Sequence, residues 1–537
     1  MSDLAISVLT PVWETDPEVL RQCIESVRAQ TYPFWQLVLV DDASTSEATR
    51  HVLRHYAWHD TRIHLHTRRV NGGIVAATND ALSRATGEYV ALLDHDDLLH
   101  PDALGAVVHL LAEDPALDVV YTDEDKVDLA GNRFGAYHKP GWSPELLYGQ
   151  MVLGHLTVYR ISQVIAAGGF RDGYMGSQDW DLALRVTEAT PRVRHLPRVL
   201  YHWRQVPGST SVDVHSKPYT ITAAHAALED ALVRRGIRGH VEDSVIGGHF
   251  HVRRDLRSRP HVSVVLPTAG GRRVVGGQER RLVDACVRAL VEGTAYEELD
   301  IVVVLNNCDD PTLEDDLTAL AGERIRFVRL EGAFNFSAAV NLGAVHARGE
   351  MLLLLNDDIE PLAEDWLLRM VEWAVDPEIG AVGAKLLFED GTVQHSGVVG
   401  FNGAPVHHTR RWDDGPGYFG EMMLTKNFLA VTGACLLVRH AVFDEVGGLS
   451  LSFPVNFNDV DFCLKLVDAG YRNLVENQAV LRHYESSSRP TTVTLGEAQR
   501  FREWWGPVMA NDPYYTYPRR IAVPPPLADA QDALLLA

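Results

Sequence analysis

Acidic side chains gather where one apolar run of this sequence ends. The run YVALL leads directly into Asp94, His95, Asp96 and Asp97. Carboxylates this close together repel one another and are hard to keep ionised unless a cation lies among them. Because carboxylate oxygens suit Mg²⁺ or Mn²⁺, and such an ion can hold the two phosphates of a nucleotide, we predict a divalent metal site at Asp94 and Asp96. The alternative is that Asp97 or Asp102 only caps the following helix.

A second kind of acidic site begins a predicted helix in two places. The segment SQDWDLALR carries Asp179 and NDVDFCLKL carries Asp459, each after a Gly-Gly-apolar turn. Stabilisation by the helix dipole is the structural alternative. A helix start can also aim a carboxylate into a cleft, where it takes a proton from an attacking hydroxyl. We therefore predict Asp179 and Asp459 as catalytic bases.

Two histidines also follow short apolar runs, His202 in VLYHWR and His483 in VLRHYE. A single histidine near a strand is more often a hydrogen-bonded structural residue. Because acids precede it in both places, we predict His202 and His483 as metal ligands. Their neighbours Trp203 and Tyr484 could stack on a sugar or pack in the core.

Polar residues at the ends of other apolar runs could bind a nucleotide. Asp42 follows WQLVLV, Asn306 and Asn307 follow DIVVVL, and Asn356 follows MLLLL. We predict that Asp42, Asp94, Asn307 and Asn356 bind this nucleotide, since ligands bind at the carboxyl ends of parallel strands. The sequence has no P-loop and no GxGxxG in the expected place, which argues against ATPases and dehydrogenases.

The chain contains an internal repeat. Four blocks recur in order: ISVLTP as VSVVLPT, ATGEYVALLDHDD as ARGEMLLLLNDD, AGGF with QDWD as VGGL with NDVD, and VLYHWR as VLRHYE. The separation of matched residues grows from 256 between Pro11 and Pro267 to 281 between His202 and His483. Collinear blocks with growing separation indicate two homologous domains with insertions in the second.

Within each copy, short apolar runs alternate with helical patterns, which predicts an α/β fold with a mostly parallel, Rossmann-like sheet. We predict an N-terminal domain over residues 1–215 and a helical or extended linker over 216–260. A C-terminal domain then covers 261–490, and a helix with a Pro-rich tail covers 491–537.

Composition narrows the class of protein. The 537 residues are 46% apolar and 23% charged, with a formal charge of −23, which argues against a general nucleic-acid binder. The five cysteines are scattered and lack metal-ligand spacing, as expected for buried free thiols. No apolar run is long enough to span a membrane and no basic leader precedes the first strand, so we expect a cytoplasmic protein. The basic-aromatic stretch 504–520 could contact the inner face of the membrane or pack in the core.

Together these blocks resemble the family 2 glycosyltransferases of GT-A fold, and in particular tandem bacterial proteins of O-antigen and surface-polysaccharide synthesis. The resemblance covers about residues 5–205 and 261–490. It implies that Asp94 and Asp96 form the family's metal and diphosphate motif, that Asp42 contacts the nucleoside and that Asp179 is the base.

In the second copy the resemblance implies a metal at Asp358 and His483, with Asp459 as the base. Asn356 stands where the first copy has Asp94, so this metal site holds one charge fewer. The segments NFSAAVN and NDVDFCLKL are similar to those of rhamnosyl- and galactofuranosyl-type transferases, which accept such a change.

The resemblance therefore implies an inverting transferase that uses Mn²⁺ or Mg²⁺ and takes its sugar from a nucleotide-sugar donor. The implied acceptor is a glycan, namely a growing surface polysaccharide that is linked to a lipid. We expect two active sites. The alternative is one active domain beside a domain that only binds glycan or donor. A nucleotidyltransferase would need a basic loop gripping a triphosphate near the N-terminus, and TPVWETD offers none.

Overall fold

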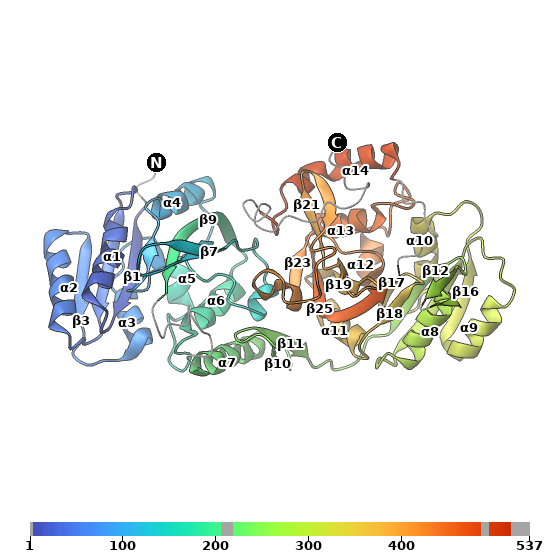
Figure 1. The fold of residues 1–537 in the computed structure, drawn as a ribbon, viewed down its shortest axis with the longest axis horizontal. Coiled ribbons are helices and arrows are strands. Elements are labelled where there is room, and N and C mark those ends of the chain that lie inside the picture. Colours follow the sequence, from blue (N-terminus) through green and yellow to red (C-terminus); the bar gives the residue numbers. More distant parts are fainter. Residues whose placement is uncertain (1–3, 206–217, 276, 485–492, 517–537) are drawn as a thin grey trace. The chain divides into compact units, whose positions relative to one another are not determined.

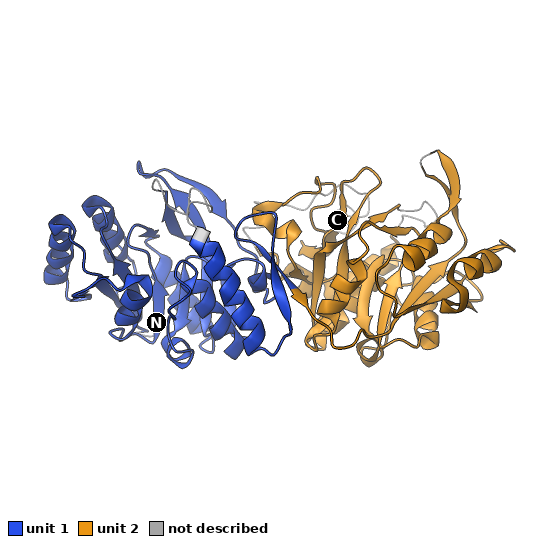
Figure 2. Cartoon of the chain, turned by 90° about the horizontal axis from the view of Figure 1, so that it is seen from below, with its two compact units in different colours: residues 1–252, 517–522 blue, residues 253–516, 523–537 orange. Residues whose placement is uncertain are grey.

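A computed structural model describes residues 4–205, 218–275, 277–484 and 493–516 (Figure 1). Within these residues the chain divides into two compact units (Figure 2), unit 1 ending at Val252 and unit 2 beginning at Arg253. Each unit contains its own large sheet and core.

Unit 1 alternates strands and helices before ending in a hairpin. Its elements are β1 (Ile6–Val12), α1 (Pro17–Arg28), β2 (Trp35–Asp41), α2 (Glu47–His59), β3 (Ile63–Thr67), α3 (Gly73–Leu82), β4 (Tyr89–Leu92), β5 (Leu98–Leu99), α4 (Ala103–Glu113), β6 (Val119–Val127), β7 (Arg133–Tyr137), η1 (Leu146–Tyr148), β8 (Thr157–Arg160), α5 (Ile161–Ala166), α6 (Gln178–Ala189), β9 (Val193–Arg204), α7 (Pro218–Arg234), β10 (Gly239–Asp243) and β11 (Phe250–Arg254).

Unit 2 repeats this order with insertions. Its elements are β12 (Val262–Thr268), β13 (Arg272–Val275), β14 (Gln278–Arg281), α8 (Leu282–Glu292), β15 (Leu299–Leu305), α9 (Leu313–Ala321), η3 (Gly322–Arg324), β16 (Ile325–Arg329), α10 (Phe336–His346), β17 (Met351–Leu355), β18 (Ile359–Pro361), α11 (Trp366–Ala374), β19 (Ile379–Leu387), β20 (Val393–His395), β21 (Val398–Phe401), β22 (Ala404–His407), η4 (Tyr418–Met423), β23 (Lys426–Phe428), β24 (Cys435–Arg439), α12 (His440–Glu445), α13 (Asn458–Asp468), β25 (Arg472–His483) and α14 (Leu495–Ala510).

The two large sheets have the same topology, which confirms the duplication and the α/β class. The strand order is β3-β2-β1-β4-β8-β6-β9-β5 in unit 1 and β16-β15-β12-β17-β24-β19-β25-β18 in unit 2. In both, the first four strands are parallel and the fifth is antiparallel to the fourth. The sheets are therefore mixed, because the strands after the fourth include antiparallel pairs.

Two equivalent hydrogen bonds show why a glycine recurs just before β4 and β17. The Ser7 hydroxyl accepts a hydrogen bond from Gly87 N at 2.9 Å, and the Ser263 hydroxyl accepts one from Gly349 N at 2.8 Å. A Cβ on Gly87 would lie 2.6 Å from the Ala5 carbonyl oxygen. The repeated glycine is therefore needed where the backbone approaches the first strand.

In each unit, a helix that follows the last strand of the large sheet packs against the helix carrying the predicted base. After β9, α7 packs against α6, and after β25, α14 packs against α13. Unit 1 thus includes α7 and extends beyond the domain predicted over 1–215, and unit 2 includes α14 of the predicted 491–537 segment. Residues 517–537 of that segment lie outside the described residues.

The predicted membrane-facing stretch 504–520 is only partly described. Trp505 donates a hydrogen bond through Nε1 to Asp461 Oδ1 at 2.9 Å, so it packs within unit 2, whereas Trp504 is 48% exposed. Across the described ranges, no helix combines the length and apolar character needed to cross a bilayer. All five cysteines are free thiols, and four are buried.

Replacing Gly87 by Ala should destabilise unit 1 by about 2 kcal/mol, because the new Cβ meets backbone atoms of the first strand. The matched control is Gly105→Ala in α4, where the nearest atom would lie at 3.6 Å. That change should be neutral or stabilise by up to about 1 kcal/mol. Denaturant unfolding of both variants provides the comparison, and equal stabilities would contradict the steric argument.

Candidate active site

Unit 1 contains a cavity of about 760 Å³ at the carboxyl ends of its parallel strands. The chain crosses there from β3 to β4, on the other side of β1, which is where ligands bind in open α/β sheets. Four residues predicted from the sequence line this cavity: Asp42, Asp94, Asp96 and Asp179. Its volume is in the range of small-molecule sites.

The acidic turn after β4 combines two partly exposed acids with one buried acid. Asp94 and Asp96 face the cavity. Asp97 is 1% exposed and accepts hydrogen bonds from the Tyr201 hydroxyl at 2.5 Å and from Arg204 N at 2.7 Å. Burial, together with the charges of Asp96 and Asp94, raises the pKa of Asp97 well above its usual value. Asp97 therefore anchors the turn to β9 instead of capping a helix.

The donor set of this turn fits a divalent ion that is held jointly with a ligand. In the described part of the chain, no three His, Cys, Asp or Glu side chains are arranged to enclose a metal. Asp94 and Asp96 alone would supply two carboxylates and leave the other positions to phosphate oxygens and water. Mg²⁺ is commonly bound in this way beside nucleotide phosphates.

A buried ion pair stands behind the acidic turn. Lys139 Nζ lies 2.9 Å from Glu124 Oε2 and donates to the carbonyl oxygens of Leu153 and His155. Glu124 also accepts a hydrogen bond from His155 N at 2.8 Å. Burial raises the pKa of Glu124, but Lys139 and His155 outweigh this effect and hold it below its ordinary range.

His155 lines the cavity and carries charge towards Asp94. Its Nε2 atom lies 3.8 Å from Asp94 Oδ2, and its ring stacks on Tyr201. Burial opposes its ionisation, yet Glu124 and Asp94 raise the pKa of His155 to about 9. The acids of the cavity are thus partly balanced by an imidazolium.

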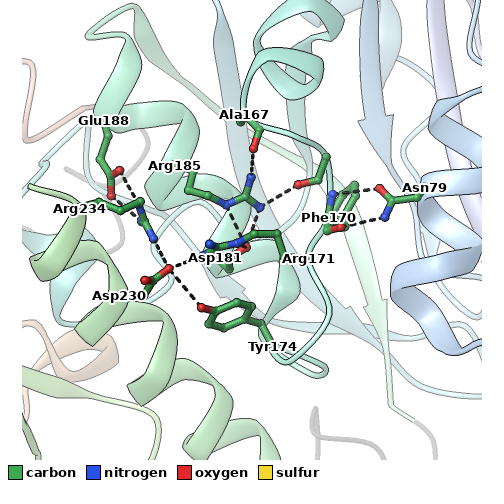
Figure 3. Close-up of polar contacts among 11 residues, drawn as sticks. Asn79, Ala167, Phe170, Arg171, Tyr174, Asp181, Arg185, Glu188, Asp230 and Arg234 are labelled. Atoms are coloured by element: carbon green, nitrogen blue, oxygen red, sulfur yellow. Dashed lines mark hydrogen bonds and ion pairs between the residues drawn. The ribbon is translucent and has the colours of Figure 1, made fainter.

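Asp179 is set by a clamp on the Gly-Gly turn before its helix. Asn79 Nδ2 donates to Phe170 O at 2.8 Å, and Phe170 N donates to Asn79 Oδ1 at 2.9 Å (Figure 3). Gly169 has a φ of 69°, and a Cβ there would lie 2.7 Å from Asn79 Oδ1. Burial raises the pKa of Asp179, which suits a group that must accept a proton.

The same helix is anchored by its second acid. Asp181 is fully buried and pairs with Arg171 and Arg185, and Arg171 continues to Asp230 on α7 at 2.6 Å (Figure 3). Arg185 also donates to the carbonyl oxygen of Gly169 at 2.8 Å. Asp181 is therefore a structural residue that fixes α6 to its neighbours.

Asp42 lies in the wall of the cavity beside the start of α3. It accepts hydrogen bonds from Arg68 Nη1 at 2.9 Å, from Gly72 N at 2.9 Å and from Gly73 N at 2.8 Å. These donors include the start of α3, whose dipole favours a carboxylate. Gly72 N also lies 3.2 Å from Asp42 Oδ2, so donors contact both oxygens of a side chain that is only 4% exposed.

His202 does not lie in this cavity, and we correct its assignment as a metal ligand. Its Nδ1 atom lies 2.6 Å from Asp125 Oδ1, and its ring packs near His100. His202 is therefore a hydrogen-bonded structural histidine, which was the alternative interpretation of the sequence. The histidines near the acids are instead His155, 3.8 Å from Asp94, and His95, 3.8 Å from Asp96.

In unit 2 the structure brings Asn356, Asp358 and His483 together. His483 Nε2 lies 3.0 Å from Asp358 Oδ1 and 3.4 Å from Asn356 Nδ2. Its Nδ1 atom lies 2.5 Å from Gln394 Oε1. Strand register makes His483 the counterpart of His202, since both pair with the short strand after the acidic turn.

Asp459 lies beside the strand that flanks this cluster. Gly433 N donates to Asp459 Oδ2 at 2.8 Å. The next residue, Ala434, accepts a hydrogen bond from Asn356 N at 3.0 Å. Asp459 thus lies next to the backbone that pairs with the end of β17.

Asn307 does not take the position of Asp42. Pro11 pairs with Val40 in β2, and Pro267 pairs with Val304 in β15, so register equates Asp42 with Asn306. Asn306 is buried and donates to Leu330 O at 2.9 Å, whereas Asn307 is exposed. Asn306 is therefore the register equivalent of Asp42, and Asn307, one residue further on, stays a predicted donor-binding residue.

His155 and Glu124 were missed because they lie outside the four blocks. A signal existed: GHLTVYR in unit 1 and GACLLVR in unit 2 occupy equivalent strands beside the metal-site strand. Because this match is short and apolar, it does not single out His155. That residue lies opposite the acidic turn only because β4 and β8 pair in antiparallel register.

Comparison with known proteins gives a family match in both units. The model of the family described as "Glycosyl transferase family 2" matches residues 7–154 and 278–447. These ranges include nearly all of β1 and the acidic turn of unit 1, and the acidic turn of unit 2.

Two curated relatives align with nearly the whole chain. The uncharacterized protein y4gI of Sinorhizobium fredii is 40% identical over 93% of this chain and 55% of its own length. The O-antigen biosynthesis protein RfbC of Myxococcus xanthus is 36% identical over 95% of this chain and 40% of its own length. The chain therefore spans about half the length of the curated relatives it matches.

Among solved structures, that of S. aureus TarS 1-349 in complex with UDP-GlcNAc matches at 16% identity and a TM-score of 0.34. The match covers 43% of this chain and 74% of TarS 1-349.

Replacing Lys139 by Met should destabilise unit 1 by about 3 kcal/mol, because Glu124 is then left buried without its cation. Adding Glu124→Gln should recover part of this loss, since Gln keeps an acceptor for His155 N without the charge. Calorimetry of the full chain measures both variants, with the unit 2 transition as internal control. Equal losses in the single and double variants would contradict the electrostatic origin.

Proposed function

The chain belongs to glycosyl transferase family 2, and we propose that the cavity of unit 1 binds a nucleotide-sugar donor and transfers its sugar to a hydroxyl of a glycan. The observation that carries this proposal is that Asp42, Asp94, Asp96 and Asp179 line one cavity. Their order along the cavity suits a nucleoside, a diphosphate and a reacting hydroxyl.

The donor end of the cavity is formed by the first strands. Asp42 would accept a hydrogen bond from the base or ribose by sharing one of its present contacts, with Asn71 and Gly73 beside it at the start of α3. Trp13, which lines the same end, is 56% exposed and provides an aromatic face. Such a combination suits a nucleoside, which is flat on its base and polar on its ribose.

Asp94 and Asp96 would hold Mn²⁺ or Mg²⁺ together with the donor diphosphate. When bound, the ion would neutralise charge on the leaving nucleoside diphosphate. His155, 3.8 Å from Asp94, adds a positive charge on the same side. Asp97 stays outside this set because its oxygens are engaged by Tyr201 and Arg204.

Asp179 would act as the base in an inverting transfer. Its carboxylate accepts the proton of the acceptor hydroxyl, whose oxygen forms a bond to the anomeric carbon as the bond to the diphosphate breaks. Burial raises the pKa of Asp179, so the carboxylate is a stronger proton acceptor than an exposed Asp. A single displacement of this kind needs no protein nucleophile.

We extend the proposal to unit 2, where Asp358 and His483 would hold the metal and Asp459 would be the base. The contact of His483 with Asp358 and the position of Asp459 beside β24 support this assignment. Asn356 and Asn306 would contact the donor.

The acceptor is proposed to be a growing, lipid-linked surface polysaccharide. This part rests on the similarity to a protein named for O-antigen biosynthesis, of which the chain covers 40%.

Thermal denaturation with Mn²⁺ and a panel of nucleotide sugars tests donor binding. A donor at a hundredfold its Kd should raise the unit 1 melting temperature by roughly 5–10 °C. Asp96→Ala should abolish the shift, and Glu113→Gln, an exposed acid at the end of α4, should retain it. Absence of any shift for the wild-type chain with every donor would contradict the proposal.

Asp179→Asn and Asp459→Asn, made separately, test whether each unit transfers a sugar. Each should lower kcat of one transfer by about 10²–10⁴-fold while donor binding persists. Product linkage analysis distinguishes two active sites, which would each lose a different linkage, from one active unit beside a binding unit. In the second case Asp459→Asn would leave every linkage intact.

A further inference from the structure

One part of the unit 1 cavity, beside Asp179, is formed by residues of the segment 216–260, which was predicted to be a linker. Tyr219 and Thr220, at the start of α7, line the cavity together with Met175, Gly176 and Asp179. A helix after the last strand thus completes one wall of this cavity.

The start of α7 is held firmly against the turn before α6. Ser177 Oγ donates to Thr220 O at 2.8 Å. A Cβ on Gly176 would lie 2.6 Å from Thr220 Cγ2 and 2.9 Å from Tyr219 Cε2, so the turn and the helix are in direct contact. Asp179 follows within three residues of this contact.

The far end of α7 is fixed to the same elements by charge. Asp230 accepts from Arg171 at 2.6 Å and from the Tyr174 hydroxyl at 3.1 Å, and Arg234 bridges it to Glu188 on α6 (Figure 3). Because both ends are held, the Tyr219 ring keeps its position relative to Asp179. Preorganisation of this kind reduces the entropy lost on binding.

Two uncharged side chains in this part of the cavity are about half exposed. Tyr219 is 49% exposed and Met175 is 55% exposed, although both line a cavity. Met175 also lies against the start of α3, since its Sδ atom would be 3.9 Å from a Cβ on Gly73. Trp203, on β9, lines the same cavity.

We propose that Tyr219 and Met175 form an acceptor subsite that binds the face of a neutral sugar ring, next to Asp179. Sugar rings present C–H faces that pack on aromatic rings, while their edges carry the hydroxyls. The nearby carboxylates Asp94, Asp96 and Asp179 would disfavour an anionic ring such as a uronate. This inference rests on the proposed transfer function and names the class of its acceptor.

The test uses the full chain with Mn²⁺ and a donor that shifts its melting temperature. Nucleoside diphosphate release is measured without acceptor, then with neutral methyl hexosides and methyl 6-deoxyhexosides, and with methyl glucuronide as the anionic match. We expect a neutral glycoside to increase release and the glucuronide to have little effect.

Tyr219→Ala should lower kcat/KM for the neutral glycoside about tenfold, with donor KM and acceptor-free release nearly unchanged. Tyr219→Phe should retain most of the stimulation, since the ring face and not the hydroxyl makes the contact. Trp58→Ala, at an aromatic residue of α2 that is 86% exposed, should behave as wild type. Melting temperatures show whether each variant is folded.

Three outcomes would overturn the subsite. These are unchanged stimulation in Tyr219→Ala, equal stimulation by the glucuronide, and nucleoside diphosphate release that no neutral glycoside increases. A wild-type chain that neither binds nor cleaves any donor would instead refute the proposed function, and the subsite with it. Donor binding by thermal shift separates these two failures.

Discussion

The clamp between one asparagine amide and the Gly-Gly turn is the interaction on which both halves of this chain depend. Asn79 bonds both backbone groups of Phe170, and Asn341 bonds both backbone groups of Leu449, at 2.8 and 2.9 Å in each case. An amide is the side chain that can donate and accept at once with this geometry; a carboxylate could not donate and an apolar residue could do neither. The clamp ties the helix after β3 or β16 to the turn before the acid-bearing helix. The start of α6 or α13, which carries Asp179 or Asp459, is thereby tied to that helix.

Much of this arrangement could be predicted from the sequence because it depends on local signals that occur twice. The acidic turn, the Gly-Gly-apolar turn and the paired Asp179 and Asp459 recur in order, and strand order follows from alternating strands and helices. The helices α7 and α14 were predicted as helices, but not as parts of the units. Their packing depends on side chains far away in sequence, such as Arg171 with Asp230 or Asp461 with Trp505. No local pattern encodes such partners.

His202 and His483 show why the role of a residue in one unit does not always carry over to its counterpart in the other. His202 and His483 have the same register, yet five residues, Leu93 to Asp97, separate β4 from β5, and only three, Asn356 to Asp358, separate β17 from β18. The shorter turn leaves Asp358 beside the histidine. In the longer turn, Asp97 is engaged by Tyr201 and Arg204, and His202 pairs with Asp125 instead. Loop length, more than residue identity, decides which acid a strand-borne histidine meets.

The same comparison explains why the two acidic turns can differ in charge. In unit 1, Asp94 lies across from His155, an imidazolium backed by the buried pair of Glu124 and Lys139. In unit 2 the equivalent strand positions hold Asn356 and Ala434, which are joined by a backbone hydrogen bond of 3.0 Å. One acid and one cation have thus been exchanged for neutral residues at facing positions. Losing Asp94 alone would leave the charge of His155 without its partner, and losing His155 alone would leave the acids more strongly repelling one another. The paired change keeps the local charge balanced, so a neutral residue in the second turn is compatible with a working diphosphate site.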